Sequence, residues 1–258
     1  MTLRSLRCLA SLLVMAAPLS AQDPDPHSAQ PERPTVATHA GTVAPRWLEL
    51  ETGLEFDRSG GEHALQAPLL FKIGLARRLQ LSVMLPFTSP VEGGTFGPAD
   101  WSFGIKWRLL EDAPVLGDFA IFPALKFPTG ASSLGRGTGT TDVSLLLISS
   151  HRLGPVAVDL NAGVTRRSGD GSLAPKTATL WTASFGGAAS GRFGWVAEVY
   201  GLPGTNGPAG SENIVALLAG PTFAVRPWIV LDLGGIIPIS GPQPYAIYSG
   251  LTWNIGKL

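Results

Sequence analysis

The sequence predicts an all-β protein, a transmembrane antiparallel up-and-down β-barrel of about twelve strands that follows a cleaved signal peptide. Three observations lead to this prediction. From Trp47 onward, apolar and polar residues alternate with a period of two, which is typical of strands. Only 15% of the 258 residues are charged, although 45% are hydrophobic. The 32 Gly and 22 Pro residues disfavour long helices, because both residue types destabilise helix interiors.

The composition also excludes several other classes of protein. The chain is too apolar and too weakly charged to be disordered throughout. Its formal net charge is zero, so it has no basic excess that would indicate nucleic acid as a partner. The single Cys, Cys8, rules out a disulfide framework and a metal site built from several thiolates.

Residues 1–21 have the features of a secretory signal peptide. Arg4 and Arg7 form a positive start, a short apolar core runs over residues 9–19, and Ala21 precedes the expected cleavage site. This apolar core is too short for a membrane-spanning helix, which needs about 20 residues. We therefore expect export into the periplasm and removal of the segment; the alternative is a buried N-terminal helix.

Residues 22–45 are predicted to be a Pro-rich periplasmic linker. Several prolines stand among charged and small residues, and apolar residues show no period. Such a composition favours an extended, mobile segment. A segment of this kind could also enter and plug the barrel, and this alternative stays open. His27 and His39 lie here without a third or fourth ligand nearby, so no metal site is expected.

Residues 46–258 form the predicted barrel. In its first strand, Leu48, Leu50 and Leu54 share one face, and the glutamates between them share the other. Further segments repeat this alternation, some of them less cleanly. In chain order, the strands are expected near residues 47–57, 65–74, 79–87, 100–109, 118–127, 142–147, 156–164, 177–189, 193–201, 213–224, 228–237 and 245–256. An even number of such strands suits a closed antiparallel barrel.

The expected connections alternate between short and long. Tight turns fall at 76–78, 151–155, 190–192 and 226–227, and longer polar stretches fall at 88–99, 128–141, 166–176 and 202–211. Short turns at one end and long loops at the other are typical of outer-membrane barrels. With a periplasmic N-terminus, the long loops lie outside the cell.

Aromatic residues near the strand ends favour a membrane barrel over a secreted soluble β-sandwich, in which they would be core residues. They suit girdles at the two lipid interfaces. The predicted girdle consists of Trp47, Trp101, Trp107, Trp195, Trp228, Tyr245 and Trp253.

Charged residues that alternate with apolar ones are expected to face the lumen, because Lys or Arg facing lipid at the midplane costs about 2–4 kcal/mol. The predicted lumen-lining residues are Glu49, Glu51, Glu55, Lys72, Lys106, Arg108, Lys126, Asp142, Asp159, Glu198 and Asp232. They form either a polarised pore wall that filters solute or a set of paired charges that fills a narrow lumen.

Three short motifs resemble those of the outer-membrane transporter family named after the MetA pathway of phenol degradation. They are the stretch from Gly97 to Arg108 (GPADWSFGIKWR), the KFPTG stretch at 126–130, and the GTGTTDV stretch at 137–143. The resemblance implies an outer-membrane β-barrel of Gram-negative bacteria that passes hydrophobic or aromatic compounds. The chain departs from many such barrels because it ends in Leu258 and not in an aromatic residue that the barrel-assembly machinery reads.

The sequence therefore favours an outer-membrane channel or transporter that passes small molecules by passive diffusion, and the family resemblance implies that hydrophobic or aromatic ones are included. The alternative is a closed-lumen structural or surface-binding barrel. Ser149 and Ser150 neighbour His151, but no acid completes a hydrolase motif, so we expect no enzyme, no catalytic residue and no cofactor. The expected partners are outer-membrane lipid, a small-molecule solute and the barrel-assembly machinery.

Overall fold

A computed structural model describes residues 25–59, 61–89 and 94–258 of the chain, so the predicted signal peptide lies outside the described residues. These residues form one antiparallel sheet in which strands adjacent in sequence pair with each other. The strands are β1 (Trp47–Ser59), β2 (Glu62–Ala67), β3 (Leu69–Ala76), β4 (Leu79–Met84), β5 (Phe87–Ser89), β6 (Gly97–Pro98), β7 (Trp101–Ala113), β8 (Gly117–Phe127), β9 (Asp142–Leu153), β10 (Val156–Arg167), β11 (Thr177–Ser190), β12 (Phe193–Leu202), β13 (Ile214–Arg226), β14 (Ile229–Ser240) and β15 (Tyr245–Lys257).

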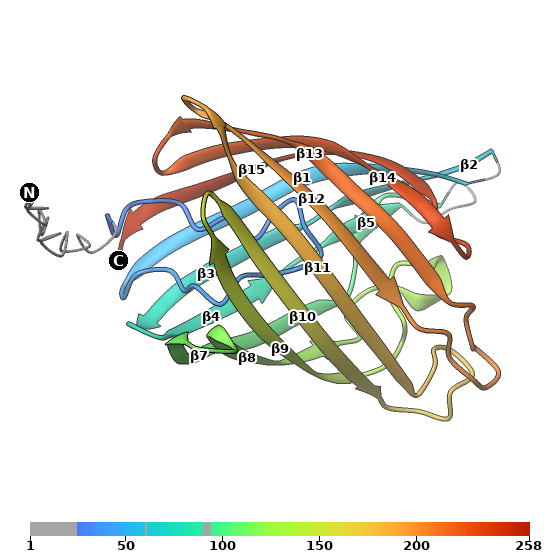
Figure 1. Ribbon diagram of the computed structural model, residues 1–258. Coiled ribbons are helices and arrows are strands. Elements are labelled where there is room, and N and C mark those ends of the chain that lie inside the picture. The colour runs from blue at the N-terminus through green and yellow to red at the C-terminus, as the bar shows by residue number, and fades with distance from the viewer. Residues whose placement is uncertain (1–24, 60, 90–93) are drawn as a thin grey trace, which may run out of the picture.

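The predicted closed barrel of 12 strands is confirmed. Short breaks divide three strands of the wall, so that β2 continues into β3, β4 into β5, and β6 into β7. Pro68 makes the first of these breaks, because proline has no N–H to donate to a neighbouring strand. The last strand, β15, pairs with β1 from Trp47↔Lys257 to Arg58↔Tyr245 and closes the sheet (Figure 1). Closure pairs the last strand of the wall with the first, so neither of these two strands is left as an open edge.

The two ends of the barrel differ in the length of their connections. At one end, called the turn end, short turns fall at 77–78, 114–116, 154–155, 191–192 and 227–228. Trp47 and Lys257 are paired at this same end. The opposite end, called the loop end, carries the long connections 128–141, 168–176 and 203–213, of which the first contains a short 3₁₀ helix, η1 (Ser132–Leu134).

Alternate residues of each strand point out of and into the barrel. On β9, Val143 and Leu145 are exposed on the outer face, whereas Asp142 and Ile148 are buried on the inner face. Large exposed hydrophobic residues occur around the wall, among them Leu54, Phe103, Leu125, Leu160, Phe185, Leu217, Leu233 and Ile247. An apolar outer band of this kind matches the hydrocarbon of a bilayer. Within the part of the chain that the structure describes, no helix is long and apolar enough to cross a bilayer.

Residues 25–46, called the plug below, lie inside the barrel (Figure 1). Their composition favoured a mobile periplasmic linker, and the structure corrects this expectation in favour of the plugging alternative. Ala37, Ala40 and Val43 are at most 2% exposed. Contacts with the wall hold the plug in place, and secondary structure of its own does not. Its docked conformation therefore could not be predicted from a periodicity in its sequence.

Candidate functional site

Side chains of the barrel wall accept hydrogen bonds from the backbone of the plug. Glu198 on β12 accepts from the amides of Val36 and Ala37, with N–O distances of 2.8 and 2.7 Å. Other backbone amides of the plug donate to side chains of the wall in the same way. The donor and acceptor pairs are Gln30 with Glu49, Glu32 and Arg33 with Glu51, Thr38 with Asn161, Ala40 with Ser150, and Val43 with Gln80. Each acceptor stands on a strand of the wall, so the plug contacts the inner face at many separate points.

These contacts answer a physical requirement of the plug. Residues 25–46 form no helix or regular strand that could pair their own backbone groups. A buried N–H group without a partner costs about 1–3 kcal/mol. Carboxylate, amide and hydroxyl oxygens of the wall remove this cost. The polar residues of the inner wall therefore dock the plug, a role distinct from both interpretations that the sequence alone suggested.

Lys72, Lys106, Glu32, Glu49 and Glu51 form a buried charge cluster between the wall and the plug. Lys72 Nζ lies 2.7 Å from Glu49 Oε1 and 2.5 Å from Glu51 Oε1. Lys106 Nζ lies 2.5 Å from Oε1 of Glu32, which belongs to the plug. The side chains of Lys72, Lys106 and Glu49 are fully buried. Because a buried charge without a partner is strongly destabilising, the pairing ties the plug to the wall.

The charge cluster also fixes the protonation of two plug side chains. Burial raises the pKa of Glu32, but the ammonium groups of Lys106 and Lys72 outweigh burial and hold this pKa well below its usual 4.5. Burial and the charge of Lys106 lower the pKa of His39 to about 3. The Glu32 carboxylate is therefore ionised at neutral pH, and the His39 imidazole is uncharged.

An aromatic contact holds the start of the plug at the turn end. The His27 ring stacks on Trp228, with ring centroids 4.7 Å apart, and its centroid lies 4.9 Å from that of Trp47. His27 Nε2 lies 3.0 Å from the backbone oxygen of Asn254, and Asn254 Nδ2 donates to the Pro26 carbonyl at 3.2 Å. Trp47 and Trp228, both predicted girdle residues, thus contact the plug.

The other residues predicted for the girdle are exposed on the outer face of the barrel. Trp101 and Tyr245 begin strands at the loop end. Trp195 and Trp253 lie near the turn end, and Trp107 lies on the same β7 strand as Trp101. Four of these five rings therefore lie toward one or the other end of the barrel, and the girdle stays a prediction.

A second charge cluster, called the loop-end cluster, contains Asp100, Lys126, Thr138, Asp142 and Arg167. Lys126 Nζ lies 2.6 Å from Asp100 Oδ2 and 3.5 Å from Asp142 Oδ2. Arg167 Nε lies 3.2 Å from the same oxygen of Asp142. The Asp100 carboxylate also accepts from the backbone amide of Thr138 at 2.9 Å. The cluster therefore joins three strands of the wall to the loop at 128–141.

The loop-end cluster brings together the three sequence motifs that carry the family resemblance. Asp100 belongs to the first motif, Lys126 to the second and Asp142 to the third. Gly130, also in the second motif, donates its amide to Asp100 Oδ1 at 3.0 Å. The motifs thus share one structural role, because together they hold the loop at 128–141 in place.

The remaining residues predicted to line the lumen have separate partners. These pairs are Asp232 with Arg33 of the plug (3.4 Å), Asp159 with Ser150 (2.6 Å), Arg108 with Glu111 (3.0 Å) and Glu55 with Gln66 (3.4 Å). The structure therefore brings some predicted residues together at the plug and others at the loop end. It does not join all of them into one continuous charged wall.

Sequence reasoning did not select the neutral polar residues that dock the plug, Gln80, Asn161 and Asn254, or Glu32 of the plug itself. The wall residues are nearly fully buried. The alternation along their strands was a usable signal, because a polar residue between apolar neighbours on a membrane strand faces inward. Their partner could not be inferred, because the plug sequence has no period.

A cavity of about 310 Å³ remains inside the barrel on the loop-end side of the plug. Its apolar lining consists of Leu70, Met84, Phe122, Ala124 and Leu146 from the wall and Val36 and Ala37 from the plug. The polar part of the lining consists of Ser82, Ser102 and Glu51 from the wall and Glu32, Arg33, Thr35 and Thr38 from the plug. Most of the exposed lining is nevertheless apolar, and the plug is one of the walls of the cavity.

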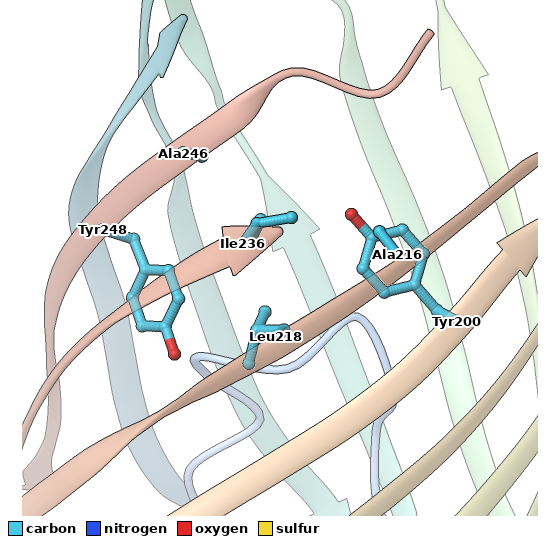
Figure 2. Close-up of a cluster of buried hydrophobic side chains, with 6 residues drawn as sticks. All are labelled: Tyr200, Ala216, Leu218, Ile236, Ala246 and Tyr248. Carbon is cyan, nitrogen blue, oxygen red and sulfur yellow. The ribbon is translucent and has the colours of Figure 1, made fainter. Parts of the chain in front are cut away.

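The inner face of β12–β15 carries a second apolar surface. It consists of Tyr200, Ala216, Leu218, Ile236, Ala246 and Tyr248 (Figure 2). Each of these side chains is at most 5% exposed. This patch differs from the polar inner wall of a water-filled porin, whereas most other buried residues of the inner face are polar or charged.

A larger depression of about 700 Å³ lies on the outer face of the barrel, over β13–β15 and β1. Leu54, Leu231, Leu233 and Leu251 border it, and these side chains point out of the barrel. Lipid would cover this surface in a membrane, so the depression is separate from the lumen.

One Ser–His contact lies near the turn end of the barrel, on β9. Over residues 25–59, 61–89 and 94–258, no three or more His, Cys, Asp or Glu side chains are grouped so that they could hold a metal ion. Ser149 Oγ lies 2.8 Å from His151 Nε2, but the Ser149 hydroxyl also donates to the Leu116 carbonyl at 2.8 Å. The single proton of the Ser149 hydroxyl therefore has two acceptors within reach, the Leu116 carbonyl and the His151 ring.

Comparisons with known proteins agree with a membrane channel fold. The COG4313 outer membrane channel from Pseudomonas putida F1 has a TM-score of 0.62 at 11% identity, with 83% of this chain and 97% of that chain covered. The KdgM porin has a TM-score of 0.55 at 10% identity, with 80% of this chain and 98% of that chain covered. The NanC porin has a TM-score of 0.54 at 10% identity, with 81% of this chain and 100% of that chain covered.

Neither the protein-family models nor the curated proteins contain a match to the sequence. At identities this low, the structural likeness shows the fold alone. The protein is a closed barrel of the class found in outer-membrane channels and porins.

Proposed function

We propose that this protein is an outer-membrane channel of the type named after the MetA pathway of phenol degradation, which passes small apolar molecules, aromatic ones included, by passive diffusion. The turn end then faces the periplasm and the loop end faces the outside. The barrel-assembly machinery inserts the chain, and outer-membrane lipid surrounds its apolar face. The three motifs gathered in the loop-end cluster and the fold shared with outer-membrane channels support this proposal.

One observation carries the choice of solute: the cavity beside the plug presents mostly apolar side chains. Phe122 and Leu146 line it from the wall, and Val36 lines it from the plug. A polar solute placed against such surfaces loses hydrogen bonds to water without replacing them. An apolar solute gains from the same contact, so the interior selects apolar molecules.

Uptake by intact Gram-negative cells tests the proposal. Cells that produce the protein are expected to take up labelled toluene several-fold faster than cells that carry the empty vector, whereas the rate of sucrose uptake stays the same. Fractionation and heat-dependent gel mobility establish that the barrel is in the outer membrane in both sets of measurements. Equal toluene rates with the barrel present would overturn the proposed function.

The docked plug favours a second candidate, a closed-lumen structural or surface-binding barrel. Hydrogen bonds from plug amides to at least Glu49, Glu51 and Glu198 hold the plug across the lumen. A closed barrel would act through its external loops, so deletion of the loop at 203–213 would abolish its function. In a channel, the same deletion would leave toluene uptake largely intact.

A further inference from the structure

We propose that the docked plug forms one wall of a binding site for a small apolar molecule, so that solute binding and plug docking strengthen each other. This inference rests on the proposed function, because it assigns a solute site inside the same lumen. It departs from the simpler view that the plug only obstructs the channel.

The cavity beside the plug has two walls from different parts of the chain. Met84, Phe122 and Leu146 come from β4, β8 and β9 of the barrel. Val36 and Ala37 come from the plug. If the plug left the lumen, the cavity would lose the second wall and open to the turn end. The site therefore exists only while the plug is docked.

Several of the plug's polar groups at this cavity bind the wall, so Val36 and Ala37 give the plug side its apolar surface. The amides of Val36 and Ala37 donate to Glu198. Glu32 and Arg33, which also line the cavity, pair with Lys106 and with Asp232 respectively. The Val36 side chain is 40% exposed, which is unusual for an apolar residue of the plug. A molecule in the cavity would cover this apolar surface.

The size of the cavity indicates the class of ligand. An engineered apolar cavity of about 150 Å³ binds benzene in another protein. Ligand pockets start at about 300 Å³. At about 310 Å³, the cavity beside the plug suits an apolar molecule of one or two rings. It is too small for an oligosaccharide or a long peptide.

The shared wall couples binding to docking. A ligand that binds only one of two states stabilises that state, and the effect grows with the ligand concentration relative to Kd. The coupling is reciprocal, so anything that holds the plug in place must strengthen ligand binding. If the plug merely obstructed the lumen, holding it in place would weaken ligand binding.

Fluorine NMR on the full chain in phospholipid nanodiscs tests the site, with 4-fluorotoluene as the probe and empty nanodiscs as the control for partitioning into lipid. Met84→Trp fills the cavity and is expected to weaken binding about tenfold or more. Val83→Trp adds the same ring on the outer face of the same strand, and binding should stay at the wild-type level. 3-Deoxy-3-fluoroglucose, a polar probe, should not bind.

Two variants test the coupling. Ala40→Cys with Ser150→Cys should form a disulfide that locks the plug, because Ala40 N lies 2.8 Å from Ser150 Oγ. Oxidised protein should bind 4-fluorotoluene at least as tightly as reduced protein. Glu198→Ala, which frees two plug amides, should weaken binding several-fold, and excess probe should protect this variant from proteolysis within the plug.

Loss of binding on locking, or unchanged binding in both Met84→Trp and Glu198→Ala, would overturn the inference. These outcomes are distinguishable from failure of the proposed function. If toluene is taken up but its binding does not depend on the plug, the protein is a channel without this site. If the probe binds but toluene is not taken up, the protein is a binding barrel and not a channel.

Discussion

The Glu198 carboxylate accepts a hydrogen bond from the backbone amide of Ala37, with an N–O distance of 2.7 Å, although the two residues are 161 positions apart in the chain. This contact joins a strand on the wall to a segment without secondary structure. It shows how the barrel uses acidic side chains that face inward. They serve as acceptors for a backbone that would otherwise lie unpaired in the lumen.

Replacement of Glu198 by Ala is expected to weaken plug docking. The amides of Val36 and Ala37 lose their acceptor, and the buried one, that of Ala37, costs about 1–3 kcal/mol when it is left unsatisfied. Conductance in planar bilayers should rise several-fold. The matched control is Glu212→Ala, which changes an exposed residue in the loop at 203–213 and should leave conductance unchanged. Equal conductance in both variants would contradict the docking role.

Replacement of Lys72 by Met is expected to destabilise the whole barrel. Glu49 and Glu51 then stay buried without their ammonium partner, and breaking a buried pair in this way costs about 3–5 kcal/mol. Urea unfolding from lipid vesicles measures the loss. Lys257→Met, at an exposed strand end, is the control. If both variants unfold at the wild-type midpoint, the charge cluster does not contribute to stability.

Plug docking is expected to depend on pH through His39. Its pKa is about 3 in the docked state and near 6.5 when the ring is free, so the released plug binds more protons between these values. Docking should be constant above about pH 7 and should weaken as the pH falls below 6.5, which conductance would report as a gradual increase. Glu32 adds no pH dependence to docking in this range. Its pKa is lowered from 4.5 in the docked state, so the protonation of its carboxylate differs between the docked and released plug only below about pH 4.5.

The matched variants for the pH experiment are His39→Gln and His63→Gln. Substitution of His39 should flatten the pH profile between 5 and 8. His63 is exposed on β2 at the loop end, so its substitution should leave the wild-type profile. A pH-dependent conductance that persists without His39 would assign the titration to another group.

The loop at 128–141 is expected to become accessible when the loop-end cluster is broken. Asp100→Ala removes the acceptor for Lys126 and for the amides of Gly130 and Thr138. Trypsin added to intact cells should then cut after Arg136 roughly tenfold faster, since cleavage follows the population of the open loop. Asp170→Ala changes an exposed loop carboxylate and serves as the control. Equal cleavage rates would show that the cluster does not hold the loop.

The sequence predicted the wall well because the wall obeys a simple rule. Residues of a membrane strand alternate between lipid and lumen, so period two located the strands and placed Glu49, Glu51 and Glu198 on the inner side. The breaks at Pro68 and near Pro86 were not foreseen, because they interrupt a strand without ending it. Closure of β15 on β1 followed from the even number of strands.

The plug could not be predicted in the same way. Its conformation depends on acceptors that come from many strands, including Asn161 and Gln80, and no local pattern in residues 25–46 records those distant contacts. The Pro-rich composition of this segment is equally typical of a solvated linker. The charged residues of the wall were recognised and a plug was kept as an open alternative, but the contacts that join the two could not be predicted.

Disulfide formation in outer membranes tests most directly whether the plug occupies the lumen. Ala40→Cys with Ser150→Cys is compared with Ala40→Cys with Ala246→Cys, whose second cysteine lies in the β12–β15 surface and has no contact with Ala40 in the described structure. Blocking free thiols after denaturation counts the cross-linked fraction. A docked plug predicts that most of the first variant is cross-linked and little of the second. A first variant that stays reduced under mild oxidation would contradict a docked plug.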